Sequence, residues 1–586
     1  MKFLGNVLAT IVGIFVFTML FFFGILIIGA IFGGEEENIE VKENSVIELN
    51  LEEIENDYAG KYSDPWVTAF SDKKHLGLTD IINAIEAAKS DENIQGISIL
   101  NNNSSLGMAQ NKALRDALED FKQSGKFVMA YANTYSQKEY YLNSVANTIY
   151  LNPVGDLDFK GLSSDLLFFK DFQDKTGIKM EVIRHGKYKS AVEPFLENKM
   201  SEANREQISA LLNSIWNFVV IDIAKSRKVS VEKLNEIANG LLARTPEMAK
   251  AQKLVDVVAY EDEYHNAIKK LLKINIKDEY ESVSISDYTQ KYLTTSIPSD
   301  ATNQIAIIYA QGEIQSGEGD VNVIGEGAMR RSISEARNNE DVKAIVLRID
   351  SPGGNALTSD LIWREIELTK KVKPIVVSMG NYAASGGYYI ACNANRIFAE
   401  NNTITGSIGV FGILPNFSGL TTKMGIHSEQ VKTHENAGNY NPFAPIDEKF
   451  KAVTTEGVEQ IYKTFVSHVA QGRKMTFAQV DAIAQGRVWT GSDAIKIGLV
   501  DKIGGLNDAI KEAARLAKIT SYNTQNYPEF NKNFDDFLEN FPFAKSKERL
   551  IKEEIGEENY RVMEEIKRIQ NYKGVQARMP FEITIQ

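Results

Sequence analysis

Cysteine and histidine are scarce in this sequence, which limits the chemistry that it can support. The one cysteine, Cys392, excludes an intrachain disulfide framework and any cysteine-rich metal site. The six histidines are scattered, without a pair at the spacing of a helical zinc site. A GxxxxGK(S/T) sequence is also missing. We therefore expect neither a metal ion nor a nucleotide cofactor.

Positive charge is in deficit as well. The chain has 65 basic and 78 acidic residues, and the resulting net charge of −13 argues against a nucleic-acid-binding surface. Hydrophobic residues at 43% and charged residues at 24% are globular proportions, and 586 residues suffice for two or three domains. We expect a multidomain protein with no nucleic-acid partner.

Charged residues are missing from one long stretch, Phe3 to Gly34, which is almost wholly apolar. About 20 such residues cross a bilayer, and the run is longer than the apolar part of a cleavable signal peptide. Lys2 precedes it and Glu35 to Glu37 follow it, so the positive-inside rule places the N-terminus in the cytoplasm. We predict an uncleaved membrane anchor over residues 1–34 and a linker over 35–48, with no second span downstream.

Downstream of the anchor, the sequence repeats itself at a nearly constant spacing. KFVMAY (126–131) recurs as KPIVVS (373–378), and VANTIYL (145–151) recurs as NANRIFA (393–399). The offset is 247 or 248 residues in these matches. Such constancy is hard to obtain by chance, so we predict two copies of one domain.

We assign residues 49–295 to a first repeat and residues 300–525 to a second repeat. Short β-rich runs alternate with longer amphipathic segments in both. In the second repeat we expect strands at 305–310, 344–350 and 375–379, and helices at 355–371 and 386–394. This alternation predicts βαβ units and an α/β fold. Residues 526–586 are charged with sparse apolar positions, and they predict a helical tail.

Two glycine-rich turns follow expected strands in the second repeat. The first, Asp350 to Gly354, has paired glycines that would let the backbone approach a ligand, although a plain strand-to-helix turn explains them equally well. In the second turn, Ser385 lies among four alanine and glycine neighbours at the start of a helix. Such a serine is sterically open, and the helix dipole would stabilise a nearby oxyanion. A capping role is the alternative, but a cap needs no small neighbours, so a nucleophile is favoured.

A nucleophilic serine needs a base. A histidine base would imply an α/β-hydrolase, and His427, His434 and His468 lie downstream of the serine. In that fold, however, the serine follows its strand directly. Here GNYAA (380–384) separates Ser385 from the expected strand, so the pattern fits poorly.

The other possible base is a lysine that burial keeps neutral. The first repeat offers two in HGKYKSAVEPF (185–195), namely Lys187 and Lys189. They are two residues apart and could face the same side of a strand. Local sequence therefore does not decide between them.

DSPGGN, AASGGYY, TGSIGV (405–410) and YKSAVEPF together resemble the signal peptide peptidase A family, in its long, tandem-repeat bacterial protease IV form. The resemblance implies an α/β fold of two tandem Clp protease/crotonase-like domains behind one N-terminal transmembrane helix. It also implies a role for each of five residues: nucleophile Ser385, general base Lys189, lysine-orienting Ser407, and oxyanion-hole donors Gly354 and Gly386. The base is then Lys189 rather than Lys187.

The family resemblance further implies a membrane-anchored Ser/Lys endopeptidase that degrades cleaved signal peptides and similar apolar peptides. It would be a homotetramer, without a cofactor, in the bacterial cytoplasmic membrane with its catalytic domains on the periplasmic side. Two other functions stay open: an acyl-CoA enzyme of the crotonase group, which would normally need a carboxylate in place of the Ser/Lys pair, and a catalytically idle membrane scaffold.

The repeat accounts for the separation of the two candidate residues. At the offset of 248, Ser385 corresponds to Gln137, and Lys189 corresponds to Ala437. Each repeat thus holds the half of the dyad that the other lacks. We expect one active site per chain, assembled where the two repeats meet.

Overall fold

The computed structural model describes most of the two repeats. The described residues are 12–20, 23–24, 39–52, 54, 56–62, 76–295, 301–438, 440–530 and 575–579. Residues 12–20 are helical and exposed. Most of the predicted anchor and most of the predicted helical tail lie outside the described residues, so both stay predictions.

The first repeat is built on a sheet of six parallel strands in the order β7-β5-β4-β3-β1-β8. Their bounds are β1 Ser45–Leu49, β3 Ile94–Leu100, β4 Phe127–Ala132, β5 Thr148–Leu151, β7 Val257–Val258 and β8 Ser282–Ser284. The central strands are apolar along their whole length because helices cover both faces of a parallel sheet.

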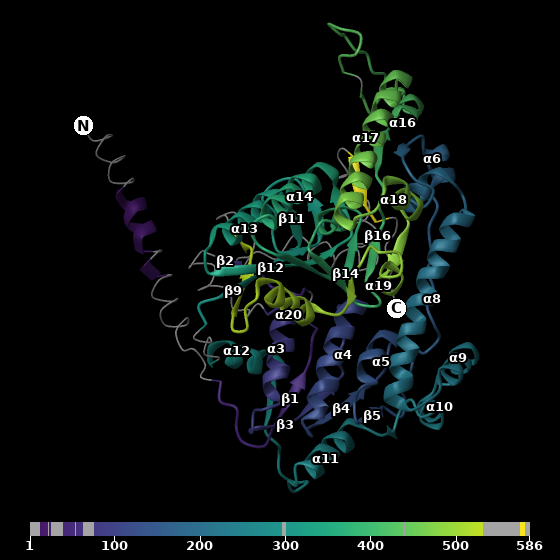
Figure 1. Ribbon diagram of the computed structural model, residues 1–586. Helices are drawn as coiled ribbons and strands as arrows, with labels where there is room; N and C mark the ends of the chain where they lie inside the picture. The colour runs from purple at the N-terminus through teal and green to yellow at the C-terminus, as the bar shows by residue number, and fades with distance from the viewer. Residues whose placement is uncertain are drawn as a thin grey trace.

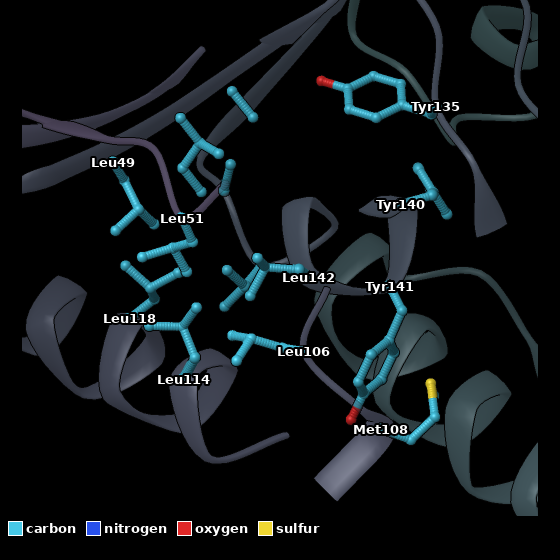
Figure 2. Close-up of a cluster of buried hydrophobic side chains, with 14 of the residues drawn as sticks. Leu49, Leu51, Leu106, Met108, Leu114, Leu118, Tyr135, Tyr140, Tyr141 and Leu142 are labelled. Atoms are coloured by element: carbon cyan, nitrogen blue, oxygen red, sulfur yellow. The ribbon is translucent and has the colours of Figure 1, made fainter. Parts of the chain in front are cut away.

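One face of this sheet packs on α3 (Leu78–Ala88), α4 (Met108–Gln123) and α5 (Gln137–Asn143). Figure 2 shows the centre of this core, where leucines of α4 meet Leu49 and Leu51 at the end of β1. The other face packs on α11 (Glu261–Leu271) through a smaller cluster around Tyr264.

The second repeat has the same strand order. From β20 the strands run β20-β9-β12-β14-β15-β19, all parallel, as the first repeat runs β8-β1-β3-β4-β5-β7. Their bounds are β9 Gln304–Gln311, β12 Val342–Ser351, β14 Ile375–Ala384, β15 Arg396–Ala399, β19 Lys502–Ile503 and β20 Asn523–Tyr527. Helices α13 (Glu326–Asn338), α14 (Ala356–Lys370), α15 (Gly386–Ala391) and α20 (Leu506–Ala517) surround it. The expected tandem α/β architecture is confirmed.

A third, mixed sheet joins the two repeats, in the order β11-β10-β13-β22-β17-β6. Its strands are β6 Lys179–Arg184, β10 Glu313–Gln315, β11 Val323–Gly325, β13 Gly353–Asn355, β17 Phe411–Asn416 and β22 Val575–Arg578. Strand β6 of the first repeat pairs antiparallel with β17 of the second repeat over six residues. Strand β22, close to the C-terminus, lies between β13 and β17.

The two repeats also share an interior. In Figure 1 the sheet of the first repeat lies below that of the second, and α4 lies between it and β14. Ala384 and Val488 of the second repeat belong to the core cluster of the first. Arg348 of β12 donates to Asp57 at 2.6 Å, and both side chains are buried. The repeats therefore form one packed body.

Helices α8 (Glu202–Arg227) and α17 (Glu448–Arg473) occupy equivalent positions in the two repeats, and each has 26 residues. By length and composition alone, α8 is the one helix in the described part of the chain that could cross a membrane. It buries Ile208, Leu211 and Ile215 in the first-repeat core, which is what a core helix of the protein interior does. This test did not reach the undescribed N-terminal residues.

Candidate active site

Ser385 stands at a sharp turn between a strand and a helix. β14 ends at Ala384, and α15 begins at Gly386. The backbone of Ser385 has φ 55° and ψ −112°, a conformation that is strained for a residue with a side chain. Its side chain makes no capping hydrogen bond, so the structure gives no support to the capping interpretation.

The expectation that the strand ends at residue 379 was wrong. β14 continues to Ala384 because Tyr382, Ala383 and Ala384 pair with β16 (Ile404–Gly406). Ser385 therefore does follow its strand directly, and the spacing argument against a strand-to-helix elbow fails. The following helix is shorter than expected, since it ends at Ala391.

Lys189 of the first repeat contacts this serine. Its Nζ donates to Ser385 Oγ at 2.8 Å and to Ser407 Oγ at 3.0 Å, and it lies 3.3 Å from the Ser407 carbonyl oxygen. All three side chains are fully buried. Lys187, by contrast, is exposed, with its amine over the Tyr188 ring.

The surroundings of the Lys189 amine are apolar. The ring of Phe411 lies 5.8 Å from Nζ, and Val192 packs with Phe411 and Ile413 in one small cluster. Burial lowers the pKa of Lys189 well below its ordinary value because the charged amine loses its hydration. A neutral amine can accept a proton from the hydroxyl with which it is paired.

Two contacts of the backbone bring Lys189 to this position. β6 leads into the lysine segment after pairing with β17, and Tyr188 N then donates to Gln485 O at 2.8 Å. Gly486 presses directly on the lysine, since a Cβ atom there would lie 2.7 Å from Lys189 N and Cβ. Sequence reasoning missed this loop, because nothing in its local pattern marks it as a partner of a lysine almost 300 residues earlier in the chain.

Ser407 is held in a similar way. It follows β16 with φ 50°, and its N–H donates to Arg487 O at 2.7 Å. Its hydroxyl and its carbonyl both face the Lys189 amine. The serine thereby limits the directions in which the amine can point.

The first glycine turn lies on the other side of Ser385. Gly353 has φ 102°, and a Cβ atom on Gly354 would lie 2.0 Å from Ile314 O, so side chains are excluded from both positions. Asn355 then caps α14, accepting from Thr358 N at 3.0 Å. Gly354 and Gly386 flank the serine from two separate helix starts, where main-chain N–H groups are free of helical partners.

The three histidines do not meet the serine. His468 stacks on Trp363 with ring centroids 3.5 Å apart and lies 3.2 Å from an Asp360 oxygen. His427 and His434 are exposed. In the described part of the chain, the hydrogen bonds of the Ser385 hydroxyl go to Lys189 and, at 3.3 Å, to the Gly409 carbonyl.

The equivalent positions of the opposite repeats carry structural residues. Gln137 accepts from Gly161 N at 2.8 Å and donates to Gly161 O at 2.9 Å, so it fastens a loop. Ala437 is exposed. Across the described ranges, no three histidine, cysteine or acidic side chains gather where they could hold a metal ion.

A cavity of about 470 Å³ lies between the repeats, next to this site. Pro352 and Met579 line its end near the glycine turn, and Lys138, Asn381 and Tyr382 line other walls. Lys138 belongs to the first-repeat turn that corresponds to Ser385 and its glycines. The cavity therefore links the serine region to the altered turn of the first repeat.

A strained serine at a strand-to-helix turn, with a buried lysine on its hydroxyl, defines the class as a serine hydrolase. Residues 120–275 and 367–520, just over half of the chain, match the family described as Peptidase family S49. The chain belongs to this family, and it is a serine protease. The predicted resemblance to signal peptide peptidase A is confirmed.

Known relatives cover most of the chain. It is 38% identical over 469 residues to Protease 4 of Salmonella typhi, which covers 77% of this chain and 74% of that protein. It is 33% identical over 490 residues to the chloroplastic serine protease SPPA of Arabidopsis thaliana, covering 82% and 70% respectively.

Among solved structures, a ClpP1 mutant from Listeria monocytogenes matches 35% of this chain and 94% of its own, at 16% identity and a TM-score of 0.24. A membrane-bound stomatin-specific protease matches 39% of this chain and 99% of its own, at 18% identity and a TM-score of 0.26.

Proposed function

We propose that this chain is a membrane-anchored endopeptidase in which Ser385 and Lys189 form the catalytic dyad, and that it degrades cleaved signal peptides and similar apolar peptides. The observation that carries the proposal is the 2.8 Å hydrogen bond between Lys189 Nζ and Ser385 Oγ, with both side chains fully buried. A neutral lysine with no acidic partner at its amine is suited to accept the serine proton.

In this mechanism Ser385 Oγ attacks the peptide carbonyl carbon while Lys189 Nζ takes the hydroxyl proton. The N–H groups of Gly354 and Gly386 stabilise the oxyanion of the tetrahedral intermediate. Lys189 then gives its proton to the leaving amine, and the C–N bond breaks. Water, activated by the same lysine, hydrolyses the ester of Ser385. Ser407 keeps the amine pointed at the reacting oxygen.

The location and the assembly belong to the same proposal. The uncharged N-terminal run would anchor the chain in the bacterial cytoplasmic membrane, with both repeats on the periplasmic side. Such a position would give the site access to apolar peptides released from the bilayer. A homotetramer would have a surface for assembly in the segment around α6 (Lys170–Thr176) and α16 (Ser418–Lys423), where Phe172, Met424 and Phe443 are exposed.

Labelling with a fluorophosphonate, followed by mass spectrometry of the full chain, tests the dyad. We expect the label on Ser385, at a rate that rises from acid to neutral pH as Lys189 loses its proton. In Lys189→Met the labelling rate should fall at least about 100-fold. Lys187→Met is the matched control and should label normally.

Either of two results would contradict the dyad. Normal labelling of a folded Lys189→Met chain would exclude the lysine as base, and a label on another serine would exclude Ser385. An unlabelled but correctly folded wild-type chain would favour the idle scaffold.

A further inference from the structure

The C-terminal strand β22 occupies the groove beside Ser385. On one side, Gln576, Ala577 and Arg578 pair antiparallel with Asn355, Gly354 and Gly353 of the glycine turn, respectively. On the other side, Val575 and Gln576 pair with Gly412 and Phe411 of β17. Both edges of the groove are therefore already hydrogen-bonded to the chain's own backbone. An extended peptide substrate would need the same two edges.

The register of β22 brings one carbonyl to the serine. The oxygen of Ala577 lies 2.2 Å from where a Cβ atom on Gly353 would be and 3.1 Å from where one on Gly386 would be. Ala577 also pairs with Gly354. Its carbonyl thus lies between the two glycines that would hold an oxyanion, which is the position of the carbonyl that a serine attacks.

The residues after Ala577 are anchored as well. Arg578 forms an ion pair with Glu313 of β10 at 2.9 Å, and its side chain is 8% exposed. Met579 N donates to Pro352 O at 2.7 Å, and its side chain packs into the first-repeat core. Arg578 and Met579 would form the leaving half if the Ala577–Arg578 bond were attacked.

Burial shows what this contact does to the site. Ser385, Lys189 and Ser407 are each 0% exposed, and Ala577 is also 0% exposed. An external peptide cannot reach the serine while β22 is in place. Entry of a substrate requires β22 to leave the sheet.

We propose that β22 is a tethered inhibitor: it fills the substrate strand position, with Ala577 at the serine, and holds the site closed to external peptides. This inference rests on the proposed function, since it takes Ser385 as the nucleophile. The strand resists cutting because its anchored leaving half keeps the Arg578 amine beside any ester that forms between Ser385 Oγ and the Ala577 carbonyl. Attack by that amine reforms the peptide bond and releases the serine, before water can enter.

The tether sets the strength of the inhibition. Residues 531–574 connect β22 to the second repeat within one chain, so β22 acts at a local concentration on the order of millimolar. External peptides compete against that concentration. Release of the strand should therefore lower KM for a peptide substrate and leave kcat nearly unchanged.

The test compares the full chain with a chain that ends at Asn571. We expect fluorophosphonate labelling of Ser385 to be about tenfold faster in the shortened chain, and KM for an apolar peptide to be about tenfold lower. A synthetic peptide of residues 572–586 should inhibit the shortened chain competitively. Dilution should leave the labelling rate of the full chain unchanged, because the contact is intramolecular.

A charge exchange tests the same contact without removing residues. Arg578→Glu places two carboxylates together and should speed labelling as truncation does. The double variant Arg578→Glu with Glu313→Arg restores an ion pair and should slow labelling again. The single variant Glu313→Arg should behave like Arg578→Glu.

The outcomes separate this inference from the proposed function. Equal labelling of Ser385 in the full and shortened chains would overturn the inhibitory contact while leaving the dyad in place. Prompt loss of residues 578–586 from the full chain would also overturn it, because β22 would then be a substrate. Faster labelling on dilution would assign the strand to a neighbouring chain. If neither chain labels at Ser385, the proposed function fails and this inference fails with it.

Discussion

Burying a lysine amine without a counter-charge costs folding free energy, and this cost is visible at Lys189. Its side chain is fully buried, and burial holds its pKa well below the ordinary value. At neutral pH the unfolded chain carries the proton and the folded chain does not, so folding must release it. Between the lowered folded pKa and the unfolded pKa near about 10.4, stability therefore rises with pH.

Replacing this lysine should separate stability from activity. Lys189→Met removes the proton-release cost, so we expect the variant to melt a few degrees higher than wild type at pH 7. The difference should shrink as the pH approaches 10. Thermal unfolding followed by circular dichroism at several pH values measures this. Lys187→Met, at an exposed position, should melt with the wild type. A Lys189→Met chain that melts lower at pH 7 would show that the amine stabilises the fold.

At the scale of elements, the candidate site depends on contacts between segments that are far apart in the sequence. β6 approaches through β17, and the loop around Gly486 closes over Lys189. Gly486 has φ 80°, and a Cβ atom there would lie 2.7 to 2.8 Å from Lys189 N, Cα and Cβ. The loop therefore determines where the lysine backbone lies.

Gly486→Ala should displace the lysine without touching the serine. A shift of about 1 Å in a catalytic group costs about 100-fold in rate, so we expect kcat to fall by that order. Steady-state hydrolysis of a small ester measures the loss. Gly412→Ala on β17 is the matched control, because a Cβ atom there meets nothing within 4 Å. Similar rates for both variants would mean that Lys189 tolerates a moved backbone.

At the scale of the whole molecule, the two repeats complete one another. Each has a parallel sheet of the same strand order, yet the serine comes from one repeat and the lysine from the other. They share core residues, the buried Asp57–Arg348 pair and the mixed sheet. Neither repeat contains both halves of the proposed dyad.

Cutting the chain between the repeats tests this dependence. Fragments 35–296 and 297–586, expressed separately, should each fail to hydrolyse a small ester, because neither has both Ser385 and Lys189. Co-expressed fragments should associate and regain part of the activity, reduced because the tether is gone. Exposure of the shared interior makes each fragment prone to aggregation, so co-purification is measured together with activity. Hydrolysis by 297–586 alone would place the base within the second repeat.

Local patterns in the sequence determined the architecture and the serine turn. Apolar runs such as 305–310 and 344–350 predict buried parallel strands because both faces of such a sheet are covered, and β9 and β12 are there. The repeat offset predicted two copies of one fold. Small residues around Ser385 marked a turn where the backbone must be open, because only alanine and glycine leave that space.

Tertiary structure alone decided which lysine is buried, where β14 ends and what fills the groove. Lys187 and Lys189 have the same local surroundings, and only the pairing of β6 with β17 and the loop at Gly486 buries the second. β14 reaches Ser385 because β16 pairs with its last three residues. β22 is four residues long, too short for a pattern to predict, and its position comes from hydrogen-bonding edges supplied by β13 and β17. These features depend on contacts between distant segments, and a local pattern carries no information about such contacts.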